Sequence, residues 1–338
     1  MPTILGIEST CDETGASIVI DGVDVKSNVV ASQVELHSKY RGVVPEIASR
    51  AHIENILPVI RESLASAGCD FADLDAIAVA HRPGLIGSLL IGVTAAKTLA
   101  WSLNKPLIGV DHVHAHLYSM QLESGASPQF PAVGLVVSGG HTSLYHLDSW
   151  TDITRLGGTI DDAVGEAYDK VASILGLGYP GGPVIDKLAA EGDCAAIKFP
   201  RTLLARDSLD FSFSGLKTAV LYHVRGVPGK PPRSAPPTES EIRDIAASFQ
   251  AACIDVLTKK LDRAVRRTSA RSLIIGGGVS ANEGLRAALA HFKLPVHFPA
   301  LAYCTDNAAM TAGLAHVLLQ QNKTSSLDLD AITYSVIQ

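Results

Sequence analysis

Three histidines within five residues form the densest group of candidate metal ligands in the chain. They occur in DHVHAH, residues 111–116, where His112 and His116 stand four positions apart. If the residues after Asp111 are helical, these two imidazoles lie one turn apart on the same face and can share a metal ion. The alternative is a helix end whose histidines bind nothing, and the spacing leaves both open. The zinc-protease pattern HExxH is not met, because Val113 replaces its glutamate base.

A third ligand for such a metal would have to come from a distant part of the chain. Asp306 stands in CTDNAAM, residues 304–310, in a polar turn before what reads as a helix of small residues. An aspartate at this point commonly caps the helix that follows it. Taken alone, this segment favours the capping role.

Carboxylates gather in two further segments. Glu8, Asp12 and Glu13 surround the first polar turn, in ESTCDET, where they could orient a nucleophile or organise water and a metal. Turn-forming aspartate and solvated glutamate are the ordinary alternative. In GEAYDK, Glu166 and Asp169 lie one helical turn apart, and an exposed acidic face explains that pair equally well.

Two glycine-containing turns follow apolar runs. In VVSGGHT, residues 136–142, the glycines would let backbone N–H groups approach an oxyanion or a phosphate, although Gly-Gly also serves plain hairpin turns. GGGVSAN, residues 276–282, joins a strand to a helix, which suits a nucleotide lying on the backbone. It matches neither GxGxxG nor the P-loop. GYPGGP, residues 178–183, reads as a structural turn.

The elements that must position these residues read as two similar halves. Residues 3–20 read as strand, polar turn and strand, and residues 132–149 repeat the pattern. Segments with helical spacing follow both hairpins, which suggests two related α/β lobes. The apolar segment 83–105 predicts a buried helix. The short strand 106–111 delivers the histidines at its carboxyl end, where open α/β sheets bind ligands.

One segment interrupts this regular pattern. Residues 225–240 hold five prolines and two glycines, and they predict an exposed loop. Thr238 and Glu241 have capping-box spacing and predict that a helix starts directly afterwards. This helix carries the strongest positive run, which is an ordinary solvated face or a nucleic-acid contact: Lys259, Lys260, Arg263, Arg266, Arg267 and Arg271. Arg225, Lys230 and Arg233 of the loop form a second such candidate.

The bulk numbers describe a protein of 338 residues that can bury a substantial core, with 47% hydrophobic residues. Lys and Arg number 28 against 34 Asp and Glu, so nucleic-acid binding would need a local basic patch. The five cysteines form no CxxC pair, which favours free thiols in a reducing compartment. We expect a soluble cytoplasmic protein without a membrane span, since no leader sequence or long apolar run is evident.

Taken together and in this order, the motifs resemble the TsaD family of tRNA N6-adenosine threonylcarbamoyltransferases. The resemblance covers essentially the whole chain and includes GIESTCDET, GVVPEIASRAH, HVHAH, VVSGGHTSL, GEAYDKVASILGLGYPGGP, FSFSGLKT, GGVSAN and CTDNAAM. It implies the two-lobed actin-like and sugar-kinase-like ATPase (ASKHA) fold with duplicated ribonuclease-H-like lobes. We expect an N-terminal lobe over 1–110 and a C-terminal lobe over 111–338, with the metal and nucleotide sites between them and the C-terminal helix packing back on the first lobe.

The resemblance also implies an acyltransferase activity. Family members transfer the threonylcarbamoyl group of threonylcarbamoyl-AMP to N6 of adenosine 37 in tRNAs that read codons beginning with A. One divalent metal per subunit, usually given as Fe²⁺ with Zn²⁺ or Mg²⁺ as alternatives, is held by residues that match His112, His116 and Asp306. Asp12 and Glu13 match the acidic pair implicated in activity. Substrate-binding positions match Val136, Val137, Ser138, Gly139, Gly140, Asp169, Gly182, Asp186 and Asn282.

The expected partners follow from the same resemblance. Bacterial members act with a TsaB-like paralogue and a TsaE-like ATPase on tRNA. A small-molecule carbamoyltransferase of the same superfamily is the main alternative, although such enzymes usually carry an additional domain that forms the adenylate. Sugar kinases and chaperones of the actin-like class generally lack the histidine pair, and a protease would need a base that the sequence does not offer.

The chain departs from the family pattern in two places. Many members read GPGL where this chain reads RPGL, so Arg82 replaces a glycine and brings a positive charge to that loop. The proline-rich segment at 225–240 is also longer than usual.

Overall fold

The computed structural model describes residues 1–40, 42–123, 127–205, 207–229 and 235–334, and the chain divides into two compact units. Unit 1 comprises Met1–Ser127, Asp148–Ile153 and His297–Gln338, and unit 2 comprises Pro128–Leu147 and Thr154–Val296. This division differs from the boundary expected at 110/111. The residues that follow the last strand of the first sheet stay with that sheet, and the C-terminal helix packs on it.

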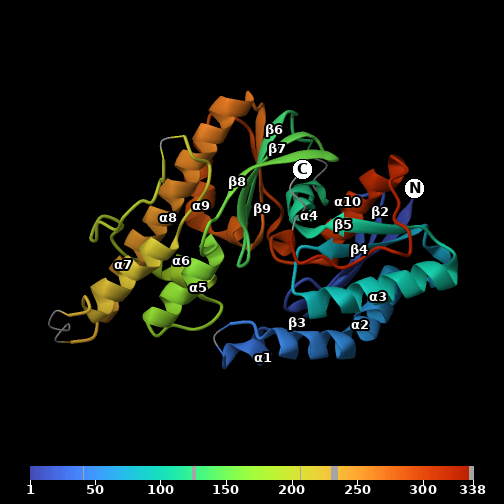
Figure 1. Ribbon diagram of the computed structural model, residues 1–338, viewed down its shortest axis with the longest axis horizontal. Coiled ribbons are helices and arrows are strands. Elements are labelled where there is room, and N and C mark those ends of the chain that lie inside the picture. The colour runs from blue at the N-terminus through green and yellow to red at the C-terminus, as the bar shows by residue number, and fades with distance from the viewer. Residues whose placement is uncertain (41, 124–126, 206, 230–234, 335–338) are drawn as a thin grey trace. The chain divides into compact units, whose positions relative to one another are not determined.

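Each unit is built on a mixed five-stranded sheet (Figure 1). The first has the order β3-β2-β1-β4-β5, in which β1 is antiparallel to β2 and parallel to β4. The second has the order β10-β9-β6-β7-β8, which is the same arrangement with β6 in the place of β1. The repeated strand–turn–strand unit is therefore confirmed. The strands are β1 (Thr3–Glu8), β2 (Glu13–Ile20), β3 (Asp24–Ser32), β4 (Ala76–Arg82), β5 (Leu107–Asp111), β6 (Ala132–Val137), β7 (Thr142–Ser149), β8 (Asp152–Gly158), β9 (Ser272–Gly276) and β10 (Val296–His297).

Helices cover both faces of the first sheet, and the alternation of side chains along β1 shows why. Leu5 and Ile7 point into one core, against α2 and α3, while Ile4 points into the other, against α4 and α10. The helices of unit 1 are α1 (Val34–Ser38), α2 (Pro45–Ala67), α3 (Ile86–Leu103), α4 (His112–Tyr118) and α10 (Ala308–Gln320), with short 3-10 turns η1 (Phe71–Asp73), η2 (Ser119–Gln121) and η4 (Leu301–Tyr303).

Helix α10 approaches β1 so closely that Gly6 has no room for a side chain. A Cβ at this position would lie 2.3 Å from the carbonyl oxygen of Ala308 and 2.9 Å from Cβ of Ala312. Gly15, which pairs with Glu8 across β1 and β2, faces Ala308 in the same way, at 3.2 Å from its backbone nitrogen. Glycine at these two positions on neighbouring strands therefore allows the first turn of α10 to pack directly against the sheet.

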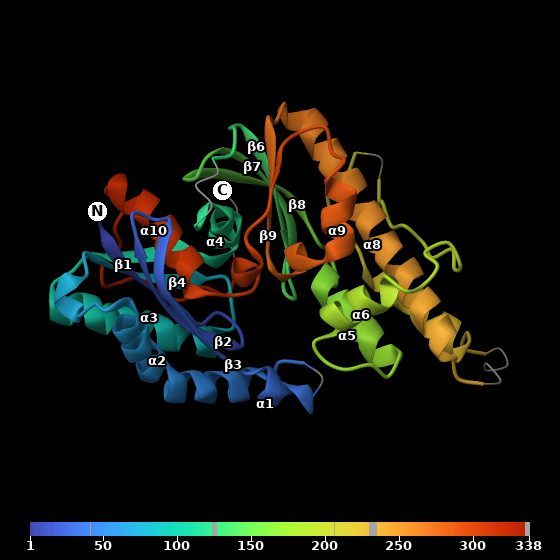
Figure 2. The same ribbon diagram turned by 180° about the vertical axis from the view of Figure 1, so that it is seen from behind.

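In unit 2 the long helix α8 packs against β6 and against α6, α7 and α9 (Figures 1 and 2). Its predicted start is confirmed, because the N–H of Thr238 donates to Glu241 at 2.8 Å and the N–H of Glu241 donates back to the Thr238 hydroxyl at 3.3 Å. The helices of this unit are α5 (Val164–Ile174), α6 (Gly181–Ala189), α7 (Ser214–Arg225), α8 (Glu239–Thr268) and α9 (Glu283–Leu289), with η3 (Gly278–Ala281).

The loop predicted at 225–240 is confirmed where it is described. Residues 226–229 and 235–238 form no regular element between α7 and α8. Lys230 and Arg233, the second basic candidate, lie outside the described residues.

Helix α3 is the one described helix that is long and apolar enough to cross a membrane. One of its faces, which includes Leu89, Val93, Ala96 and Ala100, belongs to the buried core beside β1 and β4. The helix predicted for residues 83–105 is therefore present, but it is buried on this one face only, because Ile86, Leu90 and Trp101 on the rest of its surface are exposed.

Candidate functional site

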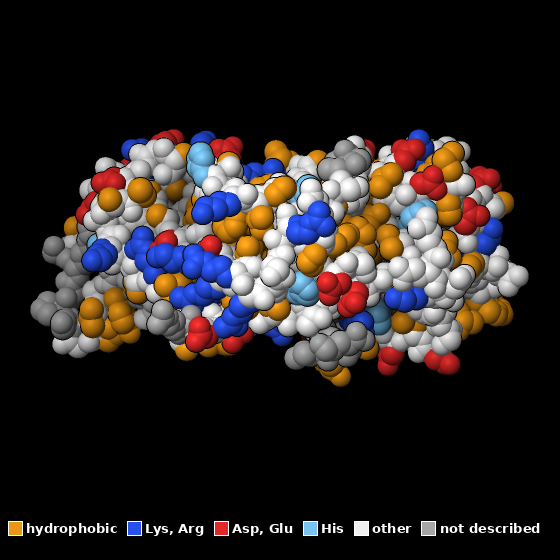
Figure 3. Space-filling model, turned by 90° about the horizontal axis from the view of Figure 1, so that it is seen from above, with side chains coloured by type: hydrophobic (Ala, Val, Ile, Leu, Met, Phe, Trp, Pro, Cys, Tyr) orange, Lys and Arg blue, Asp and Glu red, His pale blue; other side chains and the backbone are white. Residues whose placement is uncertain are grey.

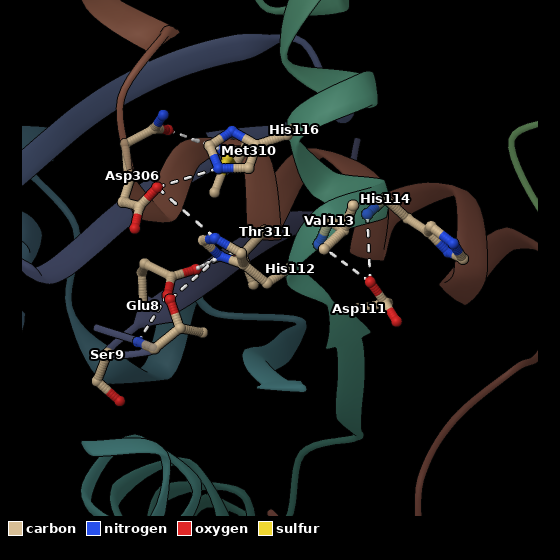
Figure 4. A network of polar contacts seen from close by, with 12 residues as sticks. Glu8, Ser9, Asp111, His112, Val113, His114, His116, Asp306, Met310 and Thr311 are labelled. Carbon is tan, nitrogen blue, oxygen red and sulfur yellow. Dashed lines mark hydrogen bonds and ion pairs between the residues drawn. The ribbon is translucent and has the colours of Figure 1, made fainter. Parts of the chain in front are cut away.

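The two outer histidines of DHVHAH are brought together on a short helix. Strand β5 ends at Asp111, whose carboxylate accepts the N–H groups of Val113 and His114 at 3.0 and 3.3 Å and so starts α4 (Figure 4). His112 and His116 are both buried, and their ring centroids lie 4.6 Å apart. The predicted helical spacing is therefore present.

Asp306 completes the group from the segment that precedes α10. Its Oδ1 lies 3.0 Å from Nε2 of His116 and 3.6 Å from Nε2 of His112 (Figure 4), and the three ligand atoms all lie within 4.8 Å of one another. Two ligands that each lie about 2.1 Å from one metal are themselves about 3.0–3.4 Å apart at octahedral or tetrahedral angles. The spacing therefore fits a shared cation.

The capping role favoured for Asp306 by its sequence context is wrong. Asn307 caps α10 instead, since its side-chain oxygen accepts the N–H of Met310 at 3.0 Å. Because the neighbouring residue takes the cap, the Asp306 carboxylate faces the two histidines.

Glu8, one of the carboxylates that the sequence suggested could organise a metal, contacts the ring nitrogen of His112 that faces away from Asp306, a contact that the sequence did not indicate. The fully buried Glu8 carboxylate lies 3.1 Å from Nδ1 of His112, and it also accepts the N–H of Thr10 at 2.9 Å and the hydroxyl of Thr311 at 3.3 Å. A carboxylate on the second ring nitrogen fixes the tautomer that leaves Nε2 as a ligand. Although burial lowers the pKa of His112, the carboxylates of Glu8 and Asp306 raise it to about 9.

The acidic pair Asp12 and Glu13 lies within the electrostatic influence of Asp306. Burial, followed by the negative charges of Asp306 and Asp12, raises the pKa of Glu13 well above its ordinary value. A cation bound by Asp306 would offset that charge and lower the pKa again. The ionisation of Glu13 is therefore coupled to the occupancy of the candidate metal site.

His52 holds both ends of this acidic turn, and the sequence analysis singled out only the motif that contains it. Nε2 of His52 donates to the carbonyl oxygen of Cys11 at 2.9 Å, so Nδ1 accepts the hydroxyl of Thr14 at 2.8 Å. Burial lowers the pKa of His52, in keeping with this neutral tautomer. His52 therefore ties the backbone carbonyl before Asp12 to the side chain that follows Glu13.

In unit 2, the backbone of the glycine turn that follows β6 has open space around it. A Cβ on Gly139 or Gly140 would meet no atom within 4 Å, and neither residue needs a positive φ. The chain's own packing therefore does not require glycine here, which leaves the backbone accessible to a ligand as well as suited to a plain hairpin turn. The N–H of Ser138 already donates to the carbonyl of His141 at 2.8 Å, so Gly139 and Gly140 supply the candidate donors. The side chains of Val136 and Val137 are buried in the sheet.

Other glycines in unit 2 have structural roles. A Cβ on Gly277 would lie 2.4 Å from the carbonyl oxygen of Val137, and its φ is 89°. Gly181 is crowded by Asp169, whereas Gly182 has open space around it. Of the glycine pair in GYPGGP, packing thus requires the first but not the second.

The predicted substrate-binding carboxylates make contacts with their own chain. Asp169 accepts the N–H of Gly181 at 2.7 Å. Asp186 accepts the side chain of Gln250 and the N–H of Glu283, each at 2.8 Å. Asn282 donates to the same Gln250 at 2.8 Å and caps α9. Asp186 and Asn282 are thereby brought together through Gln250, which the sequence analysis missed.

The basic run on α8 is largely used within the chain. Lys260 and Arg263 donate to the carbonyl groups of Leu203 and Ser208, and Arg266 pairs with Asp262 at 2.6 Å. Figure 3 shows Lys and Arg side chains gathered on one face with acidic side chains among them. Much of this basic run therefore has a structural role within the chain, in addition to any role that it has on the solvated face.

Comparison with known proteins gives consistent relatives. The family described as "TsaD: tRNA N6-adenosine threonylcarbamoyltransferase" matches residues 24–313. Proteins named tRNA N6-adenosine threonylcarbamoyltransferase are 52% identical in Moorella thermoacetica (97% of this chain and 95% of that protein) and 48% identical in Sorangium cellulosum (96% and 94%).

Solved structures show the same fold at much lower identity. Full-length HypF with phosphate and nucleotide bound has a TM-score of 0.61 at 14% identity, covering 96% of this chain and 56% of that one. Component A of (R)-2-hydroxyglutaryl-CoA dehydratase from Acidaminococcus fermentans has a TM-score of 0.54 at 14% identity, covering 94% and 98%. Together with the duplicated sheets, these matches confirm the expected actin-like ASKHA fold.

The contact between Glu8 and His112 generates a prediction about metal affinity. Replacing Glu8 by Gln keeps the shape but removes the charge that holds Nδ1, so we expect the dissociation constant for Zn²⁺ to rise by about 10- to 100-fold. Competition with a chromophoric chelator measures this change. Glu54→Gln, on the exposed side of α2, is the matched control and should bind as the wild type does. Unchanged affinity in Glu8→Gln would show that Glu8 does not support the ligand.

Proposed function

The chain belongs to the TsaD family of tRNA N6-adenosine threonylcarbamoyltransferases, and we infer from this membership that it forms threonylcarbamoyladenosine in tRNA. The observation that carries this inference is the near full-length identity of about half to curated transferases, joined to a buried group of two histidines and one aspartate. HypF shares only the fold, at 14% identity. The tRNA transferase is therefore favoured over a small-molecule carbamoyltransferase.

We propose that the donor is threonylcarbamoyl-AMP and that the acceptor is N6 of adenosine 37 in tRNAs that read codons beginning with A. The lone pair of N6 forms a bond to the carbamoyl carbon, the bond from that carbon to the phosphate oxygen breaks, and AMP leaves. N6 then gives up one proton. The enzyme has to orient a weakly nucleophilic amine, accept its proton and stabilise negative charge on the donor.

His112, His116 and Asp306 would hold one divalent cation. Two imidazoles and one carboxylate suit Fe²⁺, while imidazole ligands make Mg²⁺ the poorer choice and leave Zn²⁺ as an alternative. When bound, such a cation supplies Lewis-acid polarisation of an oxygen of the donor. The chain itself contributes the second contact on His112 through Glu8, which keeps the ligand nitrogen oriented.

The glycine turn is proposed to receive the donor. The amides of Gly139 and Gly140 can donate to a phosphate or to the oxygen that gains negative charge. Further residues are proposed to contact threonylcarbamoyl-AMP. They are Ser138, Asp169, Gly182, Asn282 and the backbone of Val136 and Val137. Both carboxylate oxygens of Asp186 accept bonds from its own chain, which favours a positioning role for this residue.

Glu13 is proposed to orient the attacking amine and accept its proton, directly or through water, with Asp12 beside it. The turn that carries both residues is fixed by His52, so the carboxylates have a defined place. By resemblance, we propose that the enzyme acts in the cytoplasm, away from membranes, with a TsaB-like paralogue and a TsaE-like ATPase.

Transfer itself tests the proposed function. Purified chain, the proposed partners, threonylcarbamoyl-AMP and unmodified tRNA should give threonylcarbamoyladenosine in a nuclease digest analysed by mass spectrometry. We expect His112→Ala and Asp306→Ala to lose roughly 100-fold or more of this rate, because each removes one ligand. His114→Ala, which alters the histidine between the two ligands, should stay within a few-fold of wild type. Full transfer by His112→Ala would contradict the metal site, and no product from wild type with all partners would contradict the function.

The role of Glu13 is tested by a nearly isosteric change. Glu13→Gln cannot accept a proton, so the transfer rate should fall by about 10²- to 10⁴-fold, while the affinity for tRNA in a filter-binding assay stays unchanged. If Glu13→Gln transfers at the wild-type rate with normal tRNA binding, the proposed role is wrong.

The open space beside Gly139 yields a prediction about the donor. Gly139→Val adds a side chain that meets no atom of its own unit, so the melting temperature should stay within a few degrees of wild type. The same side chain would block close approach of the donor, and we expect kcat/KM for threonylcarbamoyl-AMP to fall by roughly 100-fold. Gly178→Val, also in open space, is the matched control. Equal loss in both variants would argue against a donor site at Gly139.

A further inference from the structure

The short helix that carries both histidines depends on one carboxylate. Helix α4 has only seven residues, and a helix of this length is not stable by itself in water. Asp111 starts it by accepting two of its first N–H groups through Oδ1 (Figure 4). A change in the orientation of Asp111 therefore changes the orientation of His112, the next residue.

The other oxygen of Asp111 is held by Arg82. Nε of Arg82 lies 3.2 Å from Oδ2 of Asp111 in an ion pair that lacks hydrogen-bond geometry, and the two residues stand opposite each other where β4 and β5 end. The Asp111 side chain is 5% exposed and that of Arg82 is 27% exposed. A carboxylate this deeply buried is stable in its charged form only with a partner charge and hydrogen bonds. The two oxygens thus have separate tasks, one on α4 and one on Arg82.

We propose that Arg82 is a positioning residue for the metal site. Its guanidinium group fixes the Asp111 carboxylate, Asp111 fixes the first turn of α4, and α4 presents His112 and His116 to Asp306. Arg82 acts through Asp111, with which it forms an ion pair. Without the guanidinium, Asp111 either turns toward water or is left as a buried, uncompensated charge, and in both cases the first turn of α4 loosens.

This inference rests on the metal centre of the proposed function, and Co²⁺ alone is a suitable probe. The affinity for Co²⁺ is measured on the full chain by chelator competition, and the visible d–d spectrum reports the ligand geometry independently of activity. We expect Arg82→Gln to raise the dissociation constant for Co²⁺ by about 10-fold and to change the spectrum. Arg82→Lys keeps a charge near Asp111 and should recover part of both. Lys97→Gln removes another partly buried cation, which donates to Leu329, and should leave both signals unchanged.

A double-mutant cycle separates positioning from a general effect on folding. Asp111→Asn keeps a capping oxygen but needs no counter-charge, so Arg82→Gln should have little further effect on Co²⁺ binding in that background. Equal losses from Arg82→Gln in both backgrounds would overturn the proposal, as would wild-type affinity and spectrum in Arg82→Gln itself. A wild-type chain that binds no Co²⁺ would overturn the metal centre together with this inference. If the wild-type chain binds Co²⁺ and the Arg82 variants bind it with the wild-type affinity and spectrum, only this inference would fail and the metal centre would stand.

Discussion

The close contact between α10 and β1 is the constraint on which the site depends. Asp306 precedes α10 by two residues, so it meets His112 and His116 only if the first turn of that helix lies directly against the sheet. The backbone of Ala308 occupies the space that a Cβ on Gly6 would need. A methyl group there would push the helix outward, and a shift of about an ångström is enough to separate side chains that would have to share one ion.

The same packing brings together carboxylates whose negative charges repel one another. Glu8, Glu13 and Asp306 lie in a region of low exposure, where like charges interact strongly. The pKa of Glu13 rises and that of His112 rises to about 9. Protons and a cation are thus alternative ways of balancing the same carboxylates, and a metal that bound at this candidate site would release protons.

Local patterns predicted the elements well, and the misses have a physical cause. The hairpins, the helix after Asp111 and the capping box at Thr238 depend on near neighbours, and all are present. The capping role of Asp306 was wrong because Asn307 competes for the same N–H groups. The contact of Glu8 with His112 has no local signal, since it joins distant segments. The return of residues 297–338 to the first unit has none either, and the resemblance alone led to the expectation that the C-terminal helix packs on that lobe. Motif resemblance grouped His112, His116 and Asp306 as candidate ligands, which spacing alone could not do, and the structure places them side by side.

The two sheets share one strand order, and each places a short turn after its central strand. In the first sheet that turn, Ser9–Asp12, is flanked by the carboxylates of Glu8 and Glu13; in the second, Ser138–His141, it carries two open glycines. One turn therefore has a negative potential suited to cations, while the other offers bare amide dipoles suited to anions. A few residues at the ends of these strands set this polarity, so a duplicated scaffold could acquire opposite ionic specificities in its two copies without altering either hydrophobic core.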